Sequence, residues 1–206
     1  MSSDVPTSVF YCVDEKLIAA PPGECFALLR RIGEYGRWWR LVGIEPVRGG
    51  ELLEVGSEFD FVGRRGEGRA VRWRCAVRGL TPPGEDVKDR AGFHARSTPE
   101  LTTRGAGVGR IDLEYTEGDL AGPTGWEIEP APGKGGTLVR YVYRGVQPMC
   151  PESARTFIAH GTRFHSHAMQ HDALAGIARL LGGPGSELSD EAWDARVRAA
   201  MSRFVP

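Results

Sequence analysis

Six short segments between residues 43 and 146 show the pattern of β-strands and are separated by turns rich in glycine. We expect these strands at 43–47, 57–63, 70–81, 110–117, 125–129 and 136–146. The alternation is clearest in the third segment, where Val71, Trp73, Cys75 and Val77 take one face and Arg72, Arg74 and Arg78 take the other. Such alternation is typical of an antiparallel sheet with one face in water. The arginine side predicts a solvated surface.

The order of the remaining elements completes the fold prediction. A strand at 9–18 precedes two short helices, one at 22–32 that begins with Pro22 and one that holds Trp38 and Trp39. A long stretch at 152–181 reads as an uninterrupted helix. We therefore predict an α+β fold, with about seven curved antiparallel strands that bury their inner face on the long helix.

The overall composition excludes several classes of partner. Lys and Arg total 26 and Asp and Glu total 27, for a net charge of -1, so nothing favours nucleic acid as a partner. The four cysteines are widely spaced and form no CxxC motif, which fits reduced thiols better than disulfides or a zinc site. The first ten residues lack a leader pattern, and no run approaches the roughly 18 apolar residues of a membrane span. We expect a cytoplasmic protein with no membrane span.

Several short motifs resemble a known family. They are Ile-Ala-Ala-Pro at 18–21 leading to Trp38 and Trp39, Gly-Asp-Leu at 118–120, Gly-Trp-Glu-Ile-Glu-Pro at 125–130 and Gly-Gly-Thr-Leu-Val at 135–139. Over residues 9 to 182 the chain resembles the polyketide cyclase/dehydrase branch of the START-related SRPBCC superfamily. The resemblance implies a helix-grip fold, in which the sheet wraps the long helix around a deep apolar cavity. It also implies a hydrophobic ligand, cyclic or polyketide-like.

Two features depart from that family pattern. Residues 84–109 are polar, charged and rich in glycine, and they interrupt two strands that relatives join directly, so we expect either a lid or a surface loop that folding does not need. We assign 1–182 to the ligand-binding domain, and 183–206 to a linker and an amphipathic helix. Ser189 is the expected cap of this helix, whose apolar stripe consists of Trp193, Val197, Ala200, Met201 and Phe204. The stripe predicts packing on its own domain or a homodimer through this helix.

Histidines concentrate on the long helix. At 100° per residue His160, His167 and His171 lie within about 40° of one another, whereas His165 points elsewhere. The same stripe carries Phe157, Phe164, Leu174 and Ala178. We predict that His160 and Phe164 contact a ligand and that His167 and His171 are acid/base candidates, because neutral imidazole both donates and accepts. Structural hydrogen bonding of the same histidines is the alternative.

Five aromatic residues of the predicted strands complete the candidate cavity: Phe59, Trp73, Tyr115, Trp126 and Tyr141. For each of them taken singly, the pattern favours plain core packing over ligand contact. A metal is not expected, because His160 is about 10 Å from the pair His167 and His171 and no glutamate lies between that pair. No other cofactor motif is present, and GxSxG and P-loop patterns are absent. Three functions stay open: ligand binding, an aromatase/cyclase or dehydratase reaction, and a non-catalytic regulatory role with the last helix as contact.

Overall fold

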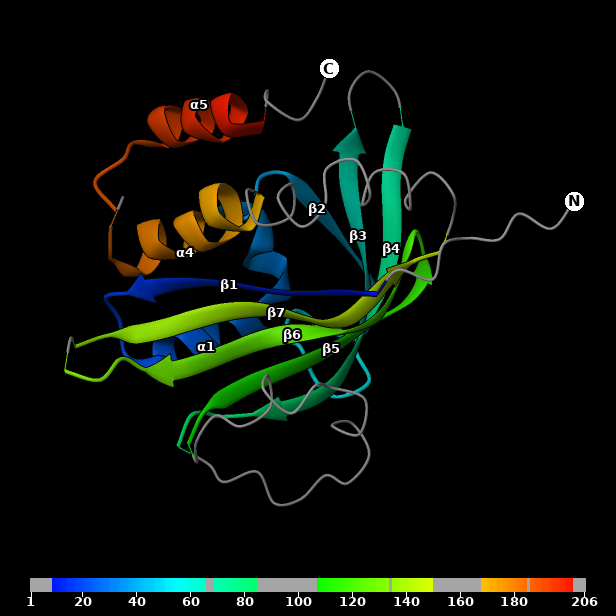
Figure 1. The fold of residues 1–206 in the computed structure, drawn as a ribbon, viewed down its shortest axis with the longest axis horizontal. Coiled ribbons are helices and arrows are strands. Elements are labelled where there is room, and N and C mark those ends of the chain that lie inside the picture. Colours follow the sequence, from blue (N-terminus) through cyan, green and yellow to red (C-terminus); the bar gives the residue numbers. More distant parts are fainter. Residues whose placement is uncertain are drawn as a thin grey trace, which may run out of the picture.

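The structure is a computed structural model that describes residues 9–65, 69–84, 107–133, 135–149, 168–184 and 186–201. Seven strands form one antiparallel sheet in the order β1-β7-β6-β5-β4-β3-β2 (Figure 1). Their bounds are β1 Phe10–Ile18, β2 Val42–Arg48, β3 Glu58–Arg65, β4 Arg69–Thr81, β5 Gly109–Gly118, β6 Leu120–Pro130 and β7 Thr137–Pro148. All seven predicted strands are present, and the predicted fold class is confirmed.

Strand β6 is longer than the sequence predicts, because it starts at Leu120 and the prediction starts at 125. The added part contains Gly122 and Pro123, which normally weaken a strand. Both are tolerated at an irregularity, where the pairing of β6 with β7 shifts between Ala121 and Thr124. A Cβ atom at Gly122 would lie 2.7 Å from the carbonyl oxygen of Gly145, so the two backbones approach too closely for a side chain.

Two short helices follow β1, as predicted, but they differ in kind. Helix α1 covers Pro22–Arg30 and begins with proline in its first turn. The second, η1, is a 3-10 helix at Ile32–Arg37, and it ends before the two tryptophans that we expected inside it. Gly33 and Gly36 both fall within its six residues, and glycine is among the weakest helix formers.

The long helix is described from Ala168 to Leu181, and the predicted part at 152–167 lies outside the described residues. It is not regular. Residues Met169–Ala173 form a π-helical turn, η2, before helix α4 at Leu174–Leu181. The backbone N–H of Leu174 bonds the carbonyl of Met169, five residues back. The helix ends where predicted, and the Gly182 carbonyl accepts a bond from Ala19 N at 3.0 Å.

The outer face of β4 carries arginines, as predicted, and they form ion pairs with carboxylates of neighbouring strands. Arg72 and Arg74 both contact Asp60, at 2.9 Å, and Arg78 contacts Glu114 at 2.6 Å. The inner face carries the apolar residues, and Cys75 and Val77 are fully buried. The period of two therefore assigned both faces of this strand correctly.

Helix α5, Asp190–Met201, begins at the predicted cap, where Ser189 Oγ accepts the N–H of Ala192 at 3.2 Å. Its stripe packs within the same chain. Trp193 and Val197 are at most 3% exposed and contact Leu41, Ala168 and Leu188. The predicted packing is thus confirmed for the described residues. A homodimer through this helix stays a prediction, and it would have to use another side of α5.

The core lies on the concave side of the sheet, which faces α1, η1 and α4 (Figure 1). At the far end of β4 and β5 the Gly84 N–H bonds the Gly107 carbonyl at 2.9 Å, so the two ends of the predicted insertion meet. The insertion between these ends, 85–106, lies outside the described residues. None of the helices in the described ranges has the length and hydrophobicity that crossing a bilayer requires.

Candidate functional site

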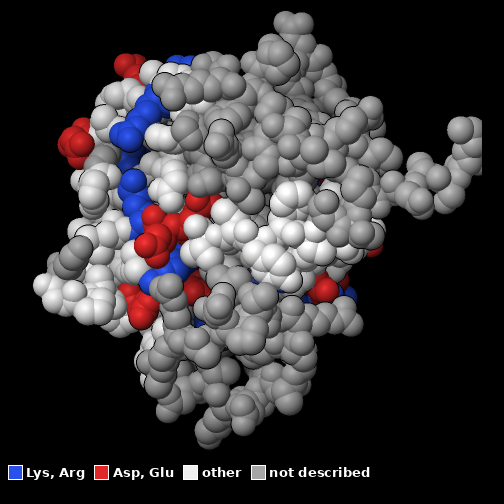
Figure 2. Space-filling model, in the orientation of Figure 1, with Lys and Arg blue, Asp and Glu red and all other residues white. Residues whose placement is uncertain are grey.

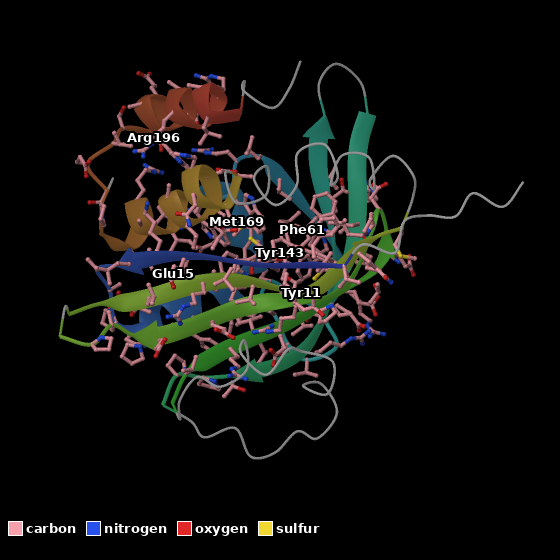
Figure 3. All side chains as sticks on the ribbon, viewed as in Figure 1. Tyr11, Glu15, Phe61, Tyr143, Met169 and Arg196 are labelled. Atoms are coloured by element: carbon pink, nitrogen blue, oxygen red, sulfur yellow. The ribbon has the colours of Figure 1, made fainter. Side chains whose placement is uncertain are left out.

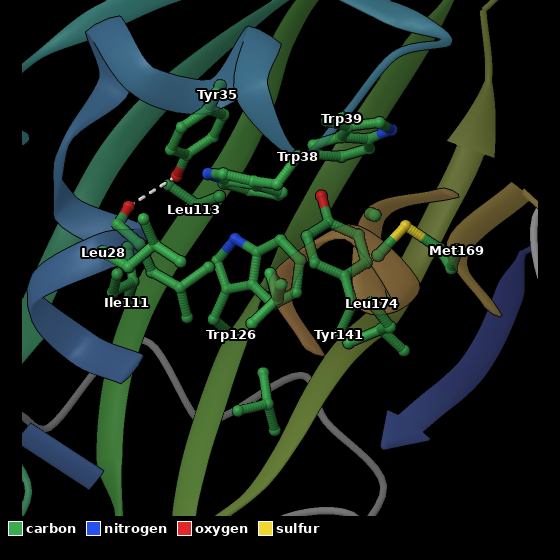
Figure 4. Close-up of a cluster of buried hydrophobic side chains, with 14 of the residues drawn as sticks. Leu28, Tyr35, Trp38, Trp39, Ile111, Leu113, Trp126, Tyr141, Met169 and Leu174 are labelled. Atoms are coloured by element: carbon green, nitrogen blue, oxygen red, sulfur yellow. Dashed lines mark hydrogen bonds between the residues drawn. The ribbon is translucent and has the colours of Figure 1, made fainter. Parts of the chain in front are cut away.

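Ten aromatic side chains form a continuous layer between the sheet and the helices, and Figure 4 shows the part that holds Tyr35, Trp38, Trp39, Trp126 and Tyr141. We call this the aromatic layer, and its members are Tyr35, Trp38, Trp39, Phe59, Phe61, Trp73, Tyr115, Trp126, Tyr141 and Tyr143. Neighbouring ring centroids lie between 4.4 and 6.5 Å apart, within the usual range of aromatic contacts. All but Trp73 are at most 6% exposed. The rings therefore fill the space that their side chains enclose.

The structure brings together all five aromatic residues that the sequence assigned to the site. Phe59, Trp73, Tyr115, Trp126 and Tyr141 are members of the aromatic layer, because each points to the inner face of its strand. The assignment of these residues to ligand contact stays a prediction, since burial in a core satisfies the same pattern.

Sequence analysis missed the other five members of the layer as site residues: Tyr35, Trp38, Trp39, Phe61 and Tyr143. Phe61 packs between Trp39 at 5.2 Å and Trp73 at 5.7 Å. Figure 3 shows Phe61 and Tyr143 between the sheet and the helix that carries Met169. The period of two already placed Phe61 on the same face as Phe59, so the signal for this residue was present.

Polar atoms are concentrated around Phe61. The hydroxyls of Tyr115 and Tyr141 hydrogen-bond each other at 2.6 Å. The indole N–H groups of Trp39 and Trp73 are buried, and among the described residues neither has a hydrogen-bond partner. Indole nitrogen can only donate, so each group lacks an acceptor. This part of the layer is apolar in area but holds two unused donors.

The other two indoles of the layer, Trp38 and Trp126, also lack a partner within the described part of the chain. They lie beside Tyr35, whose hydroxyl donates to the Leu29 carbonyl at 2.7 Å. Burial raises the pKa of this tyrosine well above its ordinary value of 10, and the contact with Trp126 opposes the rise. Trp126 therefore has a protein oxygen, the Tyr35 hydroxyl, beside it.

The tyrosines of the layer are neutral. Burial raises the pKa of Tyr115, Tyr141 and Tyr143 well above the ordinary value of 10. Neighbouring hydroxyls modify the pKa values less than burial does. These groups can donate or accept a hydrogen bond, but they cannot serve as bases near pH 7.

His171 is the only proposed histidine within the described residues, since His160 and His167, with Phe164, lie outside them. Its side chain is partly exposed, while Leu174 and Ala178 are fully buried. The three were expected on one stripe at 100° per residue. The π turn explains the difference, because it inserts an extra residue into one turn and rotates the helix before Leu174 relative to the part after it.

Asp172 is a buried acid that the sequence analysis overlooked. Its two carboxylate oxygens accept the backbone N–H groups of Arg40 at 2.9 Å and Leu41 at 2.7 Å. Burial raises the pKa of Asp172 to about 6, although the two hydrogen bonds oppose the rise. Its partners place it in a structural role, holding the chain directly after Trp39. The sequence did contain an indication of this residue, since Asp172 is the one acid between the apolar Met169 and Ala173.

Neither a metal site nor a surface depression competes with the aromatic layer among the described residues. No group of three or more His, Cys, Asp and Glu side chains within the described ranges is arranged to hold a metal ion. A depression of about 490 Å³ lies at the base of the insertion, lined largely by proline and glycine, including Pro22, Pro83 and Gly107. It shares no lining residue with the aromatic layer. The layer remains the better candidate.

Comparison with known proteins supports the fold. No protein-family model matches the chain, and no curated protein does. The aromatase/cyclase Zhui from Streptomyces sp. R1128 is 14% identical, with a TM-score of 0.53 over 94% of this chain and 98% of its own. A hypothetical protein of Helicobacter pylori, jhp0584, is 12% identical, with a TM-score of 0.53 over 84% of this chain and 88% of its own. The protein TTHA0849 of Thermus thermophilus is 16% identical, with a TM-score of 0.50 over 93% of this chain and 99% of its own.

These likenesses agree with the seven-stranded antiparallel sheet and with the helix packed on its concave side. The resemblance found in the sequence is thereby confirmed at the level of the fold. The chain has a helix-grip fold, which it shares with a polyketide aromatase/cyclase.

Proposed function

We propose that this chain binds a flat, cyclic, largely apolar small molecule that carries an acceptor oxygen, as polyketide-like molecules do. The binding position is the part of the aromatic layer around Phe61. The observation that supports it most is the pair of buried indole N–H groups, of Trp39 and Trp73, that have no acceptor within the described residues. A ligand oxygen would provide one.

The free-energy cost of unpaired buried donors favours ligand binding over a purely structural role for these rings. A buried donor without a partner costs about 1 to 3 kcal/mol, so an acceptor supplied by a ligand would be favourable at each of the two indoles that flank Phe61. The surrounding rings offer the apolar contact that small-molecule sites share. Trp73 is the one partly exposed ring of the layer, which makes it the natural point of entry. Since the rings are in contact, entry requires some of them to move.

The proposal is tested by comparing the affinity for α-tetralone, a bicyclic ketone, with the affinity for tetralin, the hydrocarbon of similar shape. Titration followed by tryptophan fluorescence should show tighter binding of the ketone by about fivefold, the value of one ordinary hydrogen bond. Trp39→Phe or Trp73→Phe should reduce this preference, and both together should abolish it. Trp193→Phe is the control for this preference, which compares two affinities and not rates of entry, because the Trp193 indole already donates to the His171 carbonyl. Equal affinity for ketone and hydrocarbon in the native protein would refute the proposal.

A second candidate is turnover of such a ligand, with His167 and His171 as acid and base. One observation favours it: His171 lies in a π turn, and such turns are frequent at functional sites. Because the tyrosines of the layer are neutral, another residue would have to act as the general base. If the histidines act in this way, His167→Ala and His171→Ala should each impair ligand binding or turnover at a modest cost in stability. Normal binding and turnover in both variants would exclude the assignment.

A further inference from the structure

Helix α5 is attached to the rest of the molecule mainly through Trp193. This indole is 1% exposed and lies between two guanidinium groups, of Arg40 at 5.1 Å and Arg179 at 4.9 Å from the ring centroid. Its Nε1 donates to the His171 carbonyl, inside the π turn, at 3.3 Å. Trp193 is thus bonded to the long helix and stacked on the segment after η1.

Charges support the same attachment. Arg40 lies 3.7 Å from Asp190 and 3.6 Å from Asp194, both on α5. Arg179 of α4 contacts Asp190 at 2.7 Å. Figure 2 shows Lys and Arg side chains as a band along the side of the molecule that bears α4 and α5, with acidic side chains beside it. Exposed pairs of this kind stabilise little by themselves, so the buried indole is the main contact.

The segment that α5 covers is the one that carries two rings of the aromatic layer. Arg40 and Leu41 directly follow Trp38 and Trp39, and their N–H groups are bonded to Asp172 of the π turn. At Gly176 a Cβ atom would clash with the Trp38 carbonyl oxygen and lie 2.8 Å from Trp193 Cζ2. At Gly176, helix α4 is therefore in direct contact with the backbone of Trp38 and with the ring of Trp193.

We propose that α5 is a latch on the aromatic layer. With Trp193 in place, the segment Trp38 to Leu41 is held against the π turn, and the rings of Trp38 and Trp39 cannot move apart. When Trp193 withdraws, the bonds from Arg40 and Leu41 to Asp172 open more often, and the layer admits a ligand. The proposal rests on the proposed function for its ligand, but the opening itself takes place in the ligand-free protein.

Two measurements on the full chain test the latch separately from binding. The first is amide hydrogen exchange of Arg40 and Leu41 without ligand. In Trp193→Ala we expect their exchange to rise about tenfold, while exchange in the strand pair β5 and β6 stays unchanged, because only a local unit opens. Trp193→Phe keeps the stacking but loses the bond to His171, and it should give a smaller rise. Arg198→Ala, an exposed change on the same helix, is the control and should change nothing.

The second measurement is the association rate of α-tetralone by stopped-flow fluorescence. It should increase in Trp193→Ala by a factor similar to the rise in exchange, and remain native in Arg198→Ala. Unchanged exchange at Arg40 and Leu41, or a rise shared equally by the whole sheet, would overturn the latch. So would a native association rate in a variant whose segment opens faster. If α-tetralone binds neither the native protein nor any variant, the proposed function fails, a result distinct from all of these.

Discussion

Asp172 is a carboxylate that the backbone of another segment holds in a place that water does not reach. It is 0% exposed, and both its oxygens accept backbone N–H groups. Desolvation dominates over these bonds and over the nearby Arg40 charge, while Asp194 adds to the rise in pKa. The two hydrogen bonds of Asp172 hold the segment after Trp39 in place. Burial at the same time favours the protonated form of its carboxyl group.

The pH dependence of stability follows from this rise. The pKa of Asp172 is about 6 in the folded state against an ordinary value of 3.8 for an aspartic acid in water, so folding favours the proton. The contribution that protonation of Asp172 makes to the free energy of unfolding is complete below pH 3.8. It is lost as the pH rises through 6, a change of about 3 kcal/mol. Urea unfolding of the native protein and of Asp172→Asn between pH 4 and 7 measures it. Relative to the variant, the native protein should lose stability as the pH rises, and parallel profiles would contradict the assignment.

Gly176 is required for close packing, not for backbone conformation. An alanine there would place its Cβ against the Trp38 carbonyl and the Trp193 ring. We expect Gly176→Ala to lower the free energy of unfolding by about 1 to 3 kcal/mol or more, as overpacked sites do. Gly23→Ala in α1 is the control, since a Cβ there meets nothing within 4 Å. That change should be neutral or slightly stabilising, and equal losses at both sites would be the wrong result.

At the scale of elements, the strands were the most predictable part of the chain. Their period of two depends only on which face is buried, and the inner positions of β3 to β7 supplied five correct members of the aromatic layer. The start of α5 followed from Ser189, whose capping bond to Ala192 is local in sequence.

The π turn could not be predicted in this way. It lies where Asp172 bonds the Arg40 and Leu41 amides and where Trp193 bonds the His171 carbonyl, all contacts between segments distant in sequence. A helical wheel at 100° per residue cannot include such contacts. For the same reason Trp39, which lies after η1 in a segment without regular period, was not assigned to the candidate site.

The insertion should be removable. Gly84 and Gly107 are already joined by a hydrogen bond, and Thr81 of β4 pairs with Arg110 of β5 beyond them. We expect replacement of residues 85–106 by a two-residue turn to leave the melting temperature within a few degrees of the native value, because shortening a loop alters closure entropy only slightly. Insoluble protein, or a large drop in melting temperature by calorimetry, would show that the insertion contributes to the core.

At the scale of the whole molecule, the aromatic layer lies between the sheet and the helices, and Trp193 of α5 belongs to a separate, smaller cluster. The sheet supplies most of its rings, and the segment after η1 supplies Trp38 and Trp39, which the long helix and α5 hold in position. Among the described residues, four indole N–H groups of this layer have no hydrogen-bond partner, and two of them, of Trp39 and Trp73, flank Phe61. The account of function depends on those two groups.

The indole ¹H–¹⁵N NMR spectrum tests that account most directly, because the chain has five tryptophans and each gives one signal. On addition of α-tetralone, the Nε1–H signals of Trp39 and Trp73 should shift as hydrogen bonds to the ketone form, and the signal of Trp193 should stay in place. Tetralin should produce no comparable shift of these two signals. If the ketone leaves the Trp39 and Trp73 signals unchanged, or moves them no more than the hydrocarbon does, the central claim is wrong.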